Sequence, residues 1–370
     1  MMRSSCITVV ALLLSTGSAH AGDWDINLGR LCQIKLKNGS TLECGGGYSP
    51  ALHGEVGSVV ADNAAFRSLM SELGVVFAPN ILSPADTQGF GGYNLSVEFG
   101  WTMVNAKKVS QDKNITGQHW FWRAAESVSA TAFRDPAALD EDRLRRELPT
   151  SFAPTVTVMA RKGLWIPVPS FELGVGVRHL IGSRMWGPQL EAKVSLHEGY
   201  QGWPIPALSV RGSATRVMGT PDFNLTVAGL DFSISKHLGI GSTFNLTPYL
   251  GYQLLWIIAD SEVVDATPGV DAMEASAKNV GYDPLKMNRC LVQDCAGSFT
   301  FEDQSNITRH RLFFGAKLNF YIASLLLEYS IFFSGSKSDQ VLDRATGITL
   351  DIPDDAGTQH NISFSIALDY

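Results

Sequence analysis

The end of the sequence most constrains the fold. The nine residues from Ile362 to Tyr370 alternate apolar and polar side chains without interruption and finish on an aromatic residue. Alternation with period two produces a β-strand with one apolar face and one polar face. A soluble chain seldom finishes on such a strand with nothing following. The pattern therefore favours a strand that closes a barrel and turns its apolar face to lipid.

The first 21 residues have the features of a secretory signal peptide. Arg3 precedes an apolar run from Cys6 to Leu14, and Ala19-His20-Ala21 forms a cleavage site of the A-x-A type. The run is too short to cross a membrane as a helix, which needs roughly 20 residues. No later apolar run in the sequence is long enough for a spanning helix. If the mature chain spans a membrane it must be a closed barrel, because only helices and closed barrels satisfy their backbone groups in lipid.

Composition agrees with this class and excludes others. Charged residues make up 18% of the chain, below the roughly 25% of soluble domains, and the 35 glycines suit a fold with many turns. The formal net charge of −7 argues against nucleic acid as a partner and against a basic protein of the membrane surface.

Alternation with period two predicts ten antiparallel strands after residue 92. The expected strands are Tyr93–Val104, Thr155–Ala160, Phe171–Leu180, Gln189–Glu198, Ala207–Arg216, Asn224–Lys236, Phe244–Asp260, Asn306–Phe320, Ser324–Ser334 and Thr358–Tyr370. Twelve strands is the alternative, if Trp120-Phe121-Trp122 belongs to a further hairpin. A change of apolar parity near Val227 predicts a β-bulge.

The apolar face of these strands carries no Asp, Glu, Lys or Arg in the well-defined strands. A Lys or Arg facing lipid at the midplane costs about 2–4 kcal/mol, so a membrane barrel excludes them there. The connections also alternate in length. Asn105–Pro154, Ser261–Ser305 and Gly335–Gly357 are long and all follow odd-numbered strands. Short periplasmic turns and long external loops are the rule in such barrels.

Residues 22–92 precede the barrel. Cys32–Cys44 is expected to form a hairpin around Lys37-Asn38-Gly39. A helix is expected over 62–74, capped by Asp62 or Asn63 and ended by Gly74. Its apolar stripe consists of Phe66, Leu69, Met70 and Leu73. The segment is expected either to lie at the periplasmic mouth of the barrel or to enter the lumen as a plug.

Four cysteines remain after removal of the signal peptide. With residues 22–92 in the periplasm and Ser261–Ser305 outside, only Cys32–Cys44 and Cys290–Cys295 can form disulfides. Neither pair offers enough ligands for a metal. We expect no metal and no cofactor.

Strand parity predicts which charged residues face the lumen. Acidic and basic side chains balance there, which indicates internal ion pairing and a closed barrel rather than a selective pore. The predicted lumen charge network consists of Glu98, Glu172, Arg178, Glu191, Lys193, Arg211, Asp231, Arg311, Lys317 and Glu328, with Arg309 and Asp369 on the same face.

A catalytic site at the outer rim is the weakest alternative. His179, His310 and His360 all fall near outer strand ends, with several aspartates close in sequence. Their parity turns them towards lipid and away from one another. The chain has no G-x-S-x-G motif and no P-loop, so no catalytic residues are predicted.

The chain resembles small bacterial outer-membrane β-barrel proteins over 93–370. The signal peptide and the alternating strands carry this resemblance, together with a terminal assembly signal made of Ile362, Phe364, Ile366, Leu368 and Tyr370. The resemblance implies an outer-membrane location and contact with lipid, lipopolysaccharide and the barrel-assembly machinery. We expect a monomeric, closed barrel that meets the environment through its outer loops. A narrow channel gated by the N-terminal segment and a rim hydrolase are the alternatives.

Overall fold

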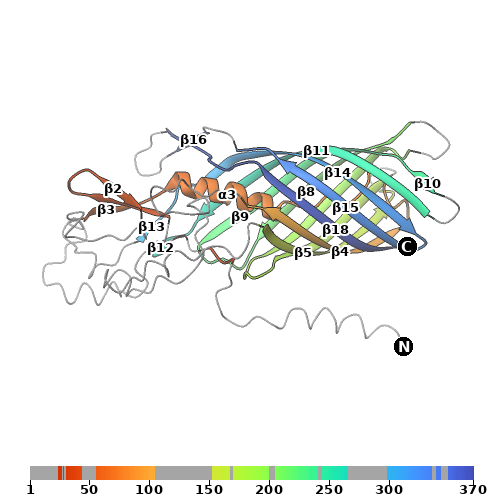
Figure 1. Ribbon diagram of the computed structural model, residues 1–370, viewed down its shortest axis with the longest axis horizontal. Coiled ribbons are helices and arrows are strands. Elements are labelled where there is room, and N and C mark those ends of the chain that lie inside the picture. Colours follow the sequence, from red (N-terminus) through yellow and green to blue (C-terminus); the bar gives the residue numbers. More distant parts are fainter. Residues whose placement is uncertain are drawn as a thin grey trace, which may run out of the picture.

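The structure is a computed structural model that describes residues 24–26, 28, 31–43, 56–104, 152–166, 170–199, 205–240, 244–265, 298–335, 339–342 and 349–370. Ten antiparallel strands of this part of the chain form a closed barrel (Figure 1). They are β4 (Tyr93–Met103), β5 (Phe152–Leu164), β6 (Phe171–Leu180), β7 (Trp186–His197), β8 (Ala207–Val217), β9 (Phe223–Ser235), β11 (Phe244–Ser261), β14 (Gln304–Phe320), β15 (Ala323–Phe332) and β18 (Gln359–Asp369).

The barrel closes between its first and last strands. β18 pairs with β4, with Phe364 opposite Phe99, and β9 pairs with β11, with Phe232 opposite Tyr252. The all-β class and the count of ten strands are confirmed. The strand predicted over 155–160 is longer than expected and extends from Phe152 to Leu164. The possible hairpin at 120–122 lies outside the described residues.

The other described elements are not part of the barrel wall. β1 (Cys32–Leu36) pairs with β2 (Thr41–Glu43) and β3 (Val56–Ala61) in a small sheet. The helix α3 (Asn63–Phe77) follows β3. The remaining strands are β10 (Leu238–Ile240), which pairs with β11, and the two-stranded pairs β12 (Val264–Asp265) with β13 (Ser298–Phe299) and β16 (Asp339–Leu342) with β17 (Thr349–Ile352). No helix in the described ranges is both long enough and apolar enough to cross a membrane.

The two ends of the barrel differ. We call the end that holds Tyr370 and the connections 165–170, 198–206, 236–243 and 321–322 the turn end. The opposite end, from which 104–151, 262–303 and 333–358 emerge, is the loop end. Figure 1 shows β12, β13 and β16 grouped at the loop end, away from the C-terminus.

The outer face of the barrel is apolar, as the strand parity predicted. Leu190, Leu250 and Leu327 are each about three-fifths exposed, so no described segment of the chain covers them. Aromatic residues ring the turn end, where Tyr321 and Tyr370 are almost fully exposed and Phe244 stacks on Phe320 with ring centroids 5.0 Å apart. An apolar band with interfacial aromatics is the surface of a barrel solvated by lipid.

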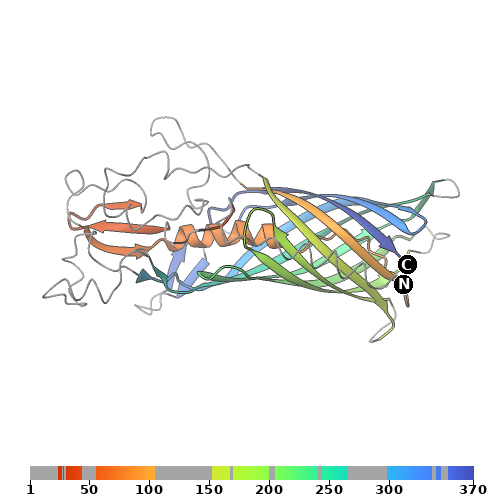
Figure 2. The same cartoon turned by 90° about the horizontal axis from the view of Figure 1, so that it is seen from below.

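The N-terminal segment lies inside the barrel and at its loop end. Figure 2 shows α3 on the barrel axis, with the β1–β3 sheet beyond the loop end. Phe66 stacks on Phe301 with centroids 4.5 Å apart, and the Glu302 amide donates to the Asn63 side chain at 3.0 Å. The sheet therefore does not lie beside the start of β4, which is at the turn end. This differs from the expected position at the mouth nearest the first strand, because the chain crosses the lumen before β4 begins.

The parity change near Val227 has a different cause from the predicted bulge. β9 pairs with β8 and β11 without a register shift through this region. Leu225 and Val227 face the lumen and are fully buried against α3. The strand is thus apolar inside near the loop end because a helix covers it there.

Gly74 does not end the helix, which continues to Phe77 with its C-cap at Ala78. A Cβ atom at Gly74 would lie 2.5 Å from Cδ1 of Ile257 on the barrel wall. Glycine is required here for close approach of helix and strand, rather than for a left-handed cap. Of the two predicted N-caps, Asp62 and Asn63, the structure shows Asp62, whose carboxylate accepts from the Ala65 amide at 3.0 Å.

Assembly is expected to depend on the apolar face of β18. Phe364→Asp places a carboxylate in lipid between Leu327 and Phe99 on the neighbouring strands, whereas Phe364→Leu keeps the face apolar. We expect the aspartate variant to lose heat-modifiable migration on gels and to be degraded, and the leucine variant to migrate as the wild type. A normally migrating Phe364→Asp protein would contradict the lipid-facing assignment.

Candidate functional site

The lumen contains a network of buried ion pairs. Arg161 bridges two carboxylates, with its Nη2 3.1 Å from Glu98 and its Nε 2.6 Å from Glu191. Arg211 pairs with Asp231 at 3.0 Å and with Glu191 at 3.5 Å. These side chains are at most 2% exposed, so each charge depends on its partners for solvation.

Three lumen arginines also hold the chain that follows α3. The Arg178 guanidinium donates to the carbonyl oxygens of Val76 and Ala78 at the C-terminus of the helix, where a cation is favoured by the helix dipole. Two further cations continue the series along the segment. Arg311 donates to Pro79 O at 2.9 Å and Arg211 to Ile81 O at 2.8 Å.

This arrangement satisfies carbonyl groups that have no strand partner. Residues 78–92 form no helix or strand, yet most of 78–85 is buried. Buried backbone carbonyls need donors, and the arginines of β6, β8 and β14 supply them. Glu328 contacts the amide side of the same segment, because it accepts from the Leu82 amide at 3.0 Å. It also accepts from Tyr249 Oη at 3.0 Å and pairs with Arg311.

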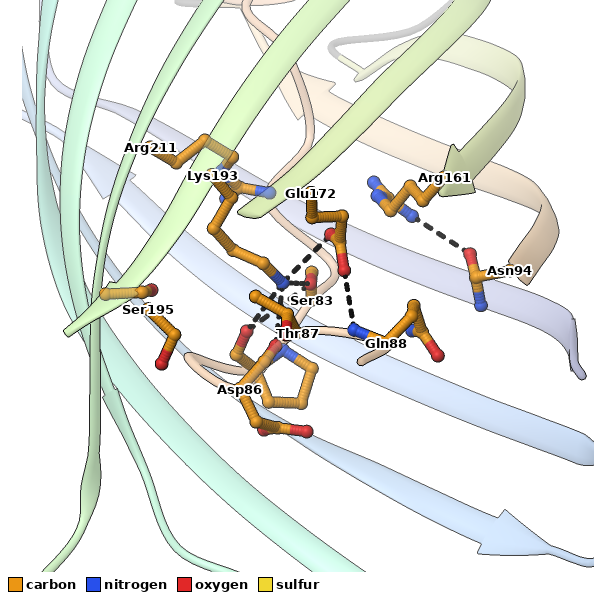
Figure 3. Close-up of polar contacts among 12 residues, drawn as sticks. Ser83, Asp86, Thr87, Gln88, Asn94, Arg161, Glu172, Lys193, Ser195 and Arg211 are labelled. Carbon is orange, nitrogen blue, oxygen red and sulfur yellow. Dashed lines mark hydrogen bonds and ion pairs between the residues drawn. The ribbon is translucent and has the colours of Figure 1, made fainter. Parts of the chain in front are cut away.

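A second cluster secures the segment nearer the turn end (Figure 3). Lys193 Nζ lies 3.0 Å from Glu172 and donates to Ser83 Oγ at 2.7 Å and to Asp86 O at 2.8 Å. Glu172 also accepts from the Gln88 amide at 2.9 Å. One buried ion pair therefore contacts the segment on both sides of Asp86.

The helix itself packs into an apolar collar of the barrel. Phe66, Leu69 and Leu73 are fully buried in one cluster with Leu255 and Ile257 of β11. Two polar contacts fix the rotation of the helix within this collar. Arg67 donates to Gln304 at 2.7 Å, and Arg309 donates to Ser71 Oγ at 3.0 Å.

At the turn end the segment meets a histidine. His237 Nε2, in the connection after β9, lies 3.4 Å from Asp86 Oδ2, and its Nδ1 lies 2.8 Å from Thr247 Oγ1. The hydrogen bond to Asp86 and then its charge raise the pKa of His237, against burial and the charges of Lys317 and Lys236, which lower it.

All ten residues of the predicted lumen network face inward and are buried. Lys317 pairs with Asp369 at 2.8 Å beside the C-terminus. Sequence reasoning missed Arg161, which joins two of the network carboxylates, because the predicted second strand ends at Ala160 whereas β5 continues to Leu164. It also missed that the cations hold backbone carbonyls.

A signal for the enclosed helix was present in the sequence. Leu254 to Ala259 is apolar at six consecutive positions, so both faces of β11 are apolar near the loop end. A barrel strand with water inside has no reason for this pattern. Apolar residues on both faces indicate a strand covered on both sides, here by lipid and by α3.

The predicted disulfides cannot be followed in this structure. Cys44, Cys290 and Cys295 lie outside the described residues, and only the backbone of Cys32 is described. β3 contacts β13 at the loop end, so the segments that carry the two cysteine pairs are not separated by the membrane as predicted. Both pairs of cysteines thus belong to segments attached to the same end of the barrel.

The rim histidines contact aromatic residues. His179 stacks on Trp186 with centroids 4.0 Å apart, and His360 bonds Tyr329 Oη at 2.7 Å. His310 bonds Tyr252 Oη. Within the described ranges, none of the three rings bonds a carboxylate, and no group of three or more His, Cys, Asp or Glu side chains is placed to hold a metal ion.

A closed ten-stranded barrel with an apolar band outside and a buried polar network inside defines a bacterial outer-membrane β-barrel protein. No protein-family model matches the chain, and the search of curated proteins found no match.

Solved structures with a similar arrangement are outer-membrane proteins. The Ail attachment invasion locus protein of Yersinia pestis is 10% identical, with a TM-score of 0.20 over 76% of this chain and 99% of that one. The transport unit of the autotransporter AIDA-I from Escherichia coli is 8% identical, with a TM-score of 0.32 over 83% and 98%. The outer membrane protease OmpT from Escherichia coli is 8% identical, with a TM-score of 0.24 over 76% and 96%. At these scores no function is transferred from them.

Removing one member of the Arg311–Glu328 pair should be costly. Arg311→Met leaves Glu328 as a buried charge without its cation and removes the donor to Pro79 O. We expect a loss of about 3–5 kcal/mol in the free energy of unfolding, measured by denaturant titration in detergent. The double variant Arg311→Met/Glu328→Gln should recover part of it, because the glutamine keeps an acceptor for the Leu82 amide and Tyr249 Oη and no uncompensated charge remains. Equal losses in both variants would show that the ion pair is not the cause.

The His237–Asp86 contact predicts a pH dependence. Because the folded pKa of His237 lies above its unfolded value of about 6.5, its stabilising effect is complete below that pH and is lost as pH rises through the folded pKa. We expect the wild type to lose this contribution to stability as pH rises above about 6.5, and His237→Gln to lose less over the same range. His197→Gln, at the end of β7, is the matched control for loss of an imidazole at the turn end. An unchanged profile in His237→Gln would contradict the assignment.

Proposed function

We propose that this protein is a closed outer-membrane barrel, plugged by its own residues 63–92, that presents a surface at its loop end and has no catalytic role. The observation that carries this proposal is the set of lumen cations bound to the backbone of the enclosed segment. Arg178, Arg311, Arg211 and Lys193 contact it in succession from Val76 to Asp86. Because these lumen cations bind the backbone of the protein's own segment, they are not arranged to line a pathway for a solute.

Size supports the same proposal. Eight strands leave an interior that side chains just fill, and open channels appear at sixteen to eighteen strands. An α-helix with its side chains is about 10–12 Å across, and α3 is buried by the barrel wall over Ala65 to Phe77. Leu255 and Ile257 are fully buried in one cluster with the helix, which supports a barrel that is closed at this collar.

The surface at the loop end combines several chain segments. The N-terminal sheet contacts β13, and β12 with β13 extends the hairpin of β11 and β14. Phe299 packs edge-on against Phe301, which joins these segments to the apolar cluster around Phe66. Part of this surface is therefore anchored to the barrel core. A site for an external partner is best supported here, and lipid and lipopolysaccharide surround the apolar band.

The channel alternative is favoured by one feature. The segment is held at the turn end by a contact that includes a titratable histidine, His237. If the segment left the lumen, the buried charges of β5 to β8 would face water and the barrel would conduct. The two functions thus differ in whether the segment leaves.

Conductance in planar bilayers separates them. We expect the purified wild type to be silent, because the lumen is filled, and a variant lacking residues 22–90 to give steady conductance. A variant lacking Cys32–Glu43 removes β1 and β2 but keeps the lumen segment, and should remain silent. Steady conductance of the wild type would contradict the closed barrel, and a silent 22–90 deletion that still folds would show that the segment is not the barrier.

A further inference from the structure

The first described residues lie at the loop end. The Trp24 amide donates to Gly182 O at 3.0 Å, in the connection between β6 and β7, and the Arg184 amide donates to Asp25 at 2.7 Å. Trp24, Leu28 and Leu31 belong to the same buried cluster as Phe66 and Leu180. The chain is therefore packed onto this end almost from the predicted signal cleavage site onward.

From there the chain makes one pass through the lumen. It begins at Asp62, whose amide donates to Leu31 O at 2.9 Å, and follows α3 and the arginine contacts. It leaves at the turn end, where the Gly91 amide lies 3.4 Å from Gly163 O. Tyr93 and Tyr370 then exchange two backbone hydrogen bonds of 2.6 and 2.8 Å, so that β4 starts beside the end of β18.

The side of the membrane follows from the connections. Outer-membrane barrels have short turns on the periplasmic side and long loops outside. The turn end then faces the periplasm, and the loop end faces the exterior. Residues 24–61 consequently lie on the side of the membrane opposite to the one on which a signal peptide is removed.

We propose that the barrel carries its own N-terminal segment across the outer membrane and displays residues 24–61, including the β1–β3 sheet, at the cell surface. This deepens the proposed function, since the segment that crosses is also the plug. The pass is part of the folded core rather than a threaded tail, because its backbone carbonyls take the donors of four buried lumen cations.

The packing also constrains when the β1–β3 sheet can form relative to the passage of the chain through the barrel. The β1–β3 sheet is a folded three-stranded unit, whereas the lumen is filled by one helix and one extended segment. Strands pair about 4.7–4.9 Å apart, so a three-stranded sheet is wider than the helix that fills the collar. The residues of β1–β3 must therefore cross as an extended chain, or before β18 pairs with β4, and form the sheet outside.

A protease site in the β1–β2 turn tests this topology. Lys37, Asn38, Gly39 and Ser40 are exposed and tolerate an insertion better than the strands. The matched control is the same site inserted between Gly199 and Pro206, in the β7–β8 connection at the turn end. We expect added protease to cut the β1–β2 site on intact cells, and to cut the control site only after the outer membrane is permeabilised.

Each outcome decides one point. Cleavage of the β1–β2 site only after permeabilisation would overturn the display proposal, since the sheet would then be periplasmic. Such a result would leave the closed barrel intact if the wild type is silent in bilayers. Heat-modifiable migration checks that each variant has assembled. An epitope inserted at Asn38 and stained with antibody on intact cells provides a second measurement if the protease site hinders assembly.

Discussion

The structure depends on hydrogen bonds from buried lumen cations to the backbone of an enclosed chain segment. A segment without secondary structure cannot be buried unless donors reach its carbonyl oxygens. Arg178, Arg211 and Arg311 provide these donors from three different strands. In turn, Glu191 and Asp231 pair with Arg211, and Glu328 pairs with Arg311, so that the wall and the plug form one polar network.

Two kinds of contact divide the lumen along its length. Near the loop end the contact is apolar, with Leu225, Val227 and Ile257 against α3. Near the turn end it is polar, with Lys193, Glu172 and His237 around an extended chain. A helix satisfies most of its own backbone and can pack on a mainly apolar wall, whereas a segment without secondary structure needs hydrogen-bond partners from the wall, here mostly charged side chains. The composition of the inner wall follows the conformation of the segment that it encloses.

Most of the barrel could be predicted from the sequence, because alternation with period two assigns each side chain to lipid or lumen without further information. The ten strands and the inward direction of residues such as Glu98 and Lys317 followed from parity alone. The pairing of Arg161 with Glu98 and Glu191 did not, since it depends on where β5 ends. Gly74 was read as a helix end because its role, contact with Ile257, joins residues far apart in sequence.

The sequence by itself determined the class of fold, since an apolar face without charges in strands of membrane-spanning length has few other uses. Only the tertiary structure decided that the N-terminal segment occupies the lumen and emerges at the loop end. The amphipathic pattern of Asn63–Phe77 indicates that one face of the helix is covered. It does not indicate which part of the chain covers that face. The covering wall is assembled from strands more than a hundred residues away, and so the path of the chain through the barrel is a property of the closed fold.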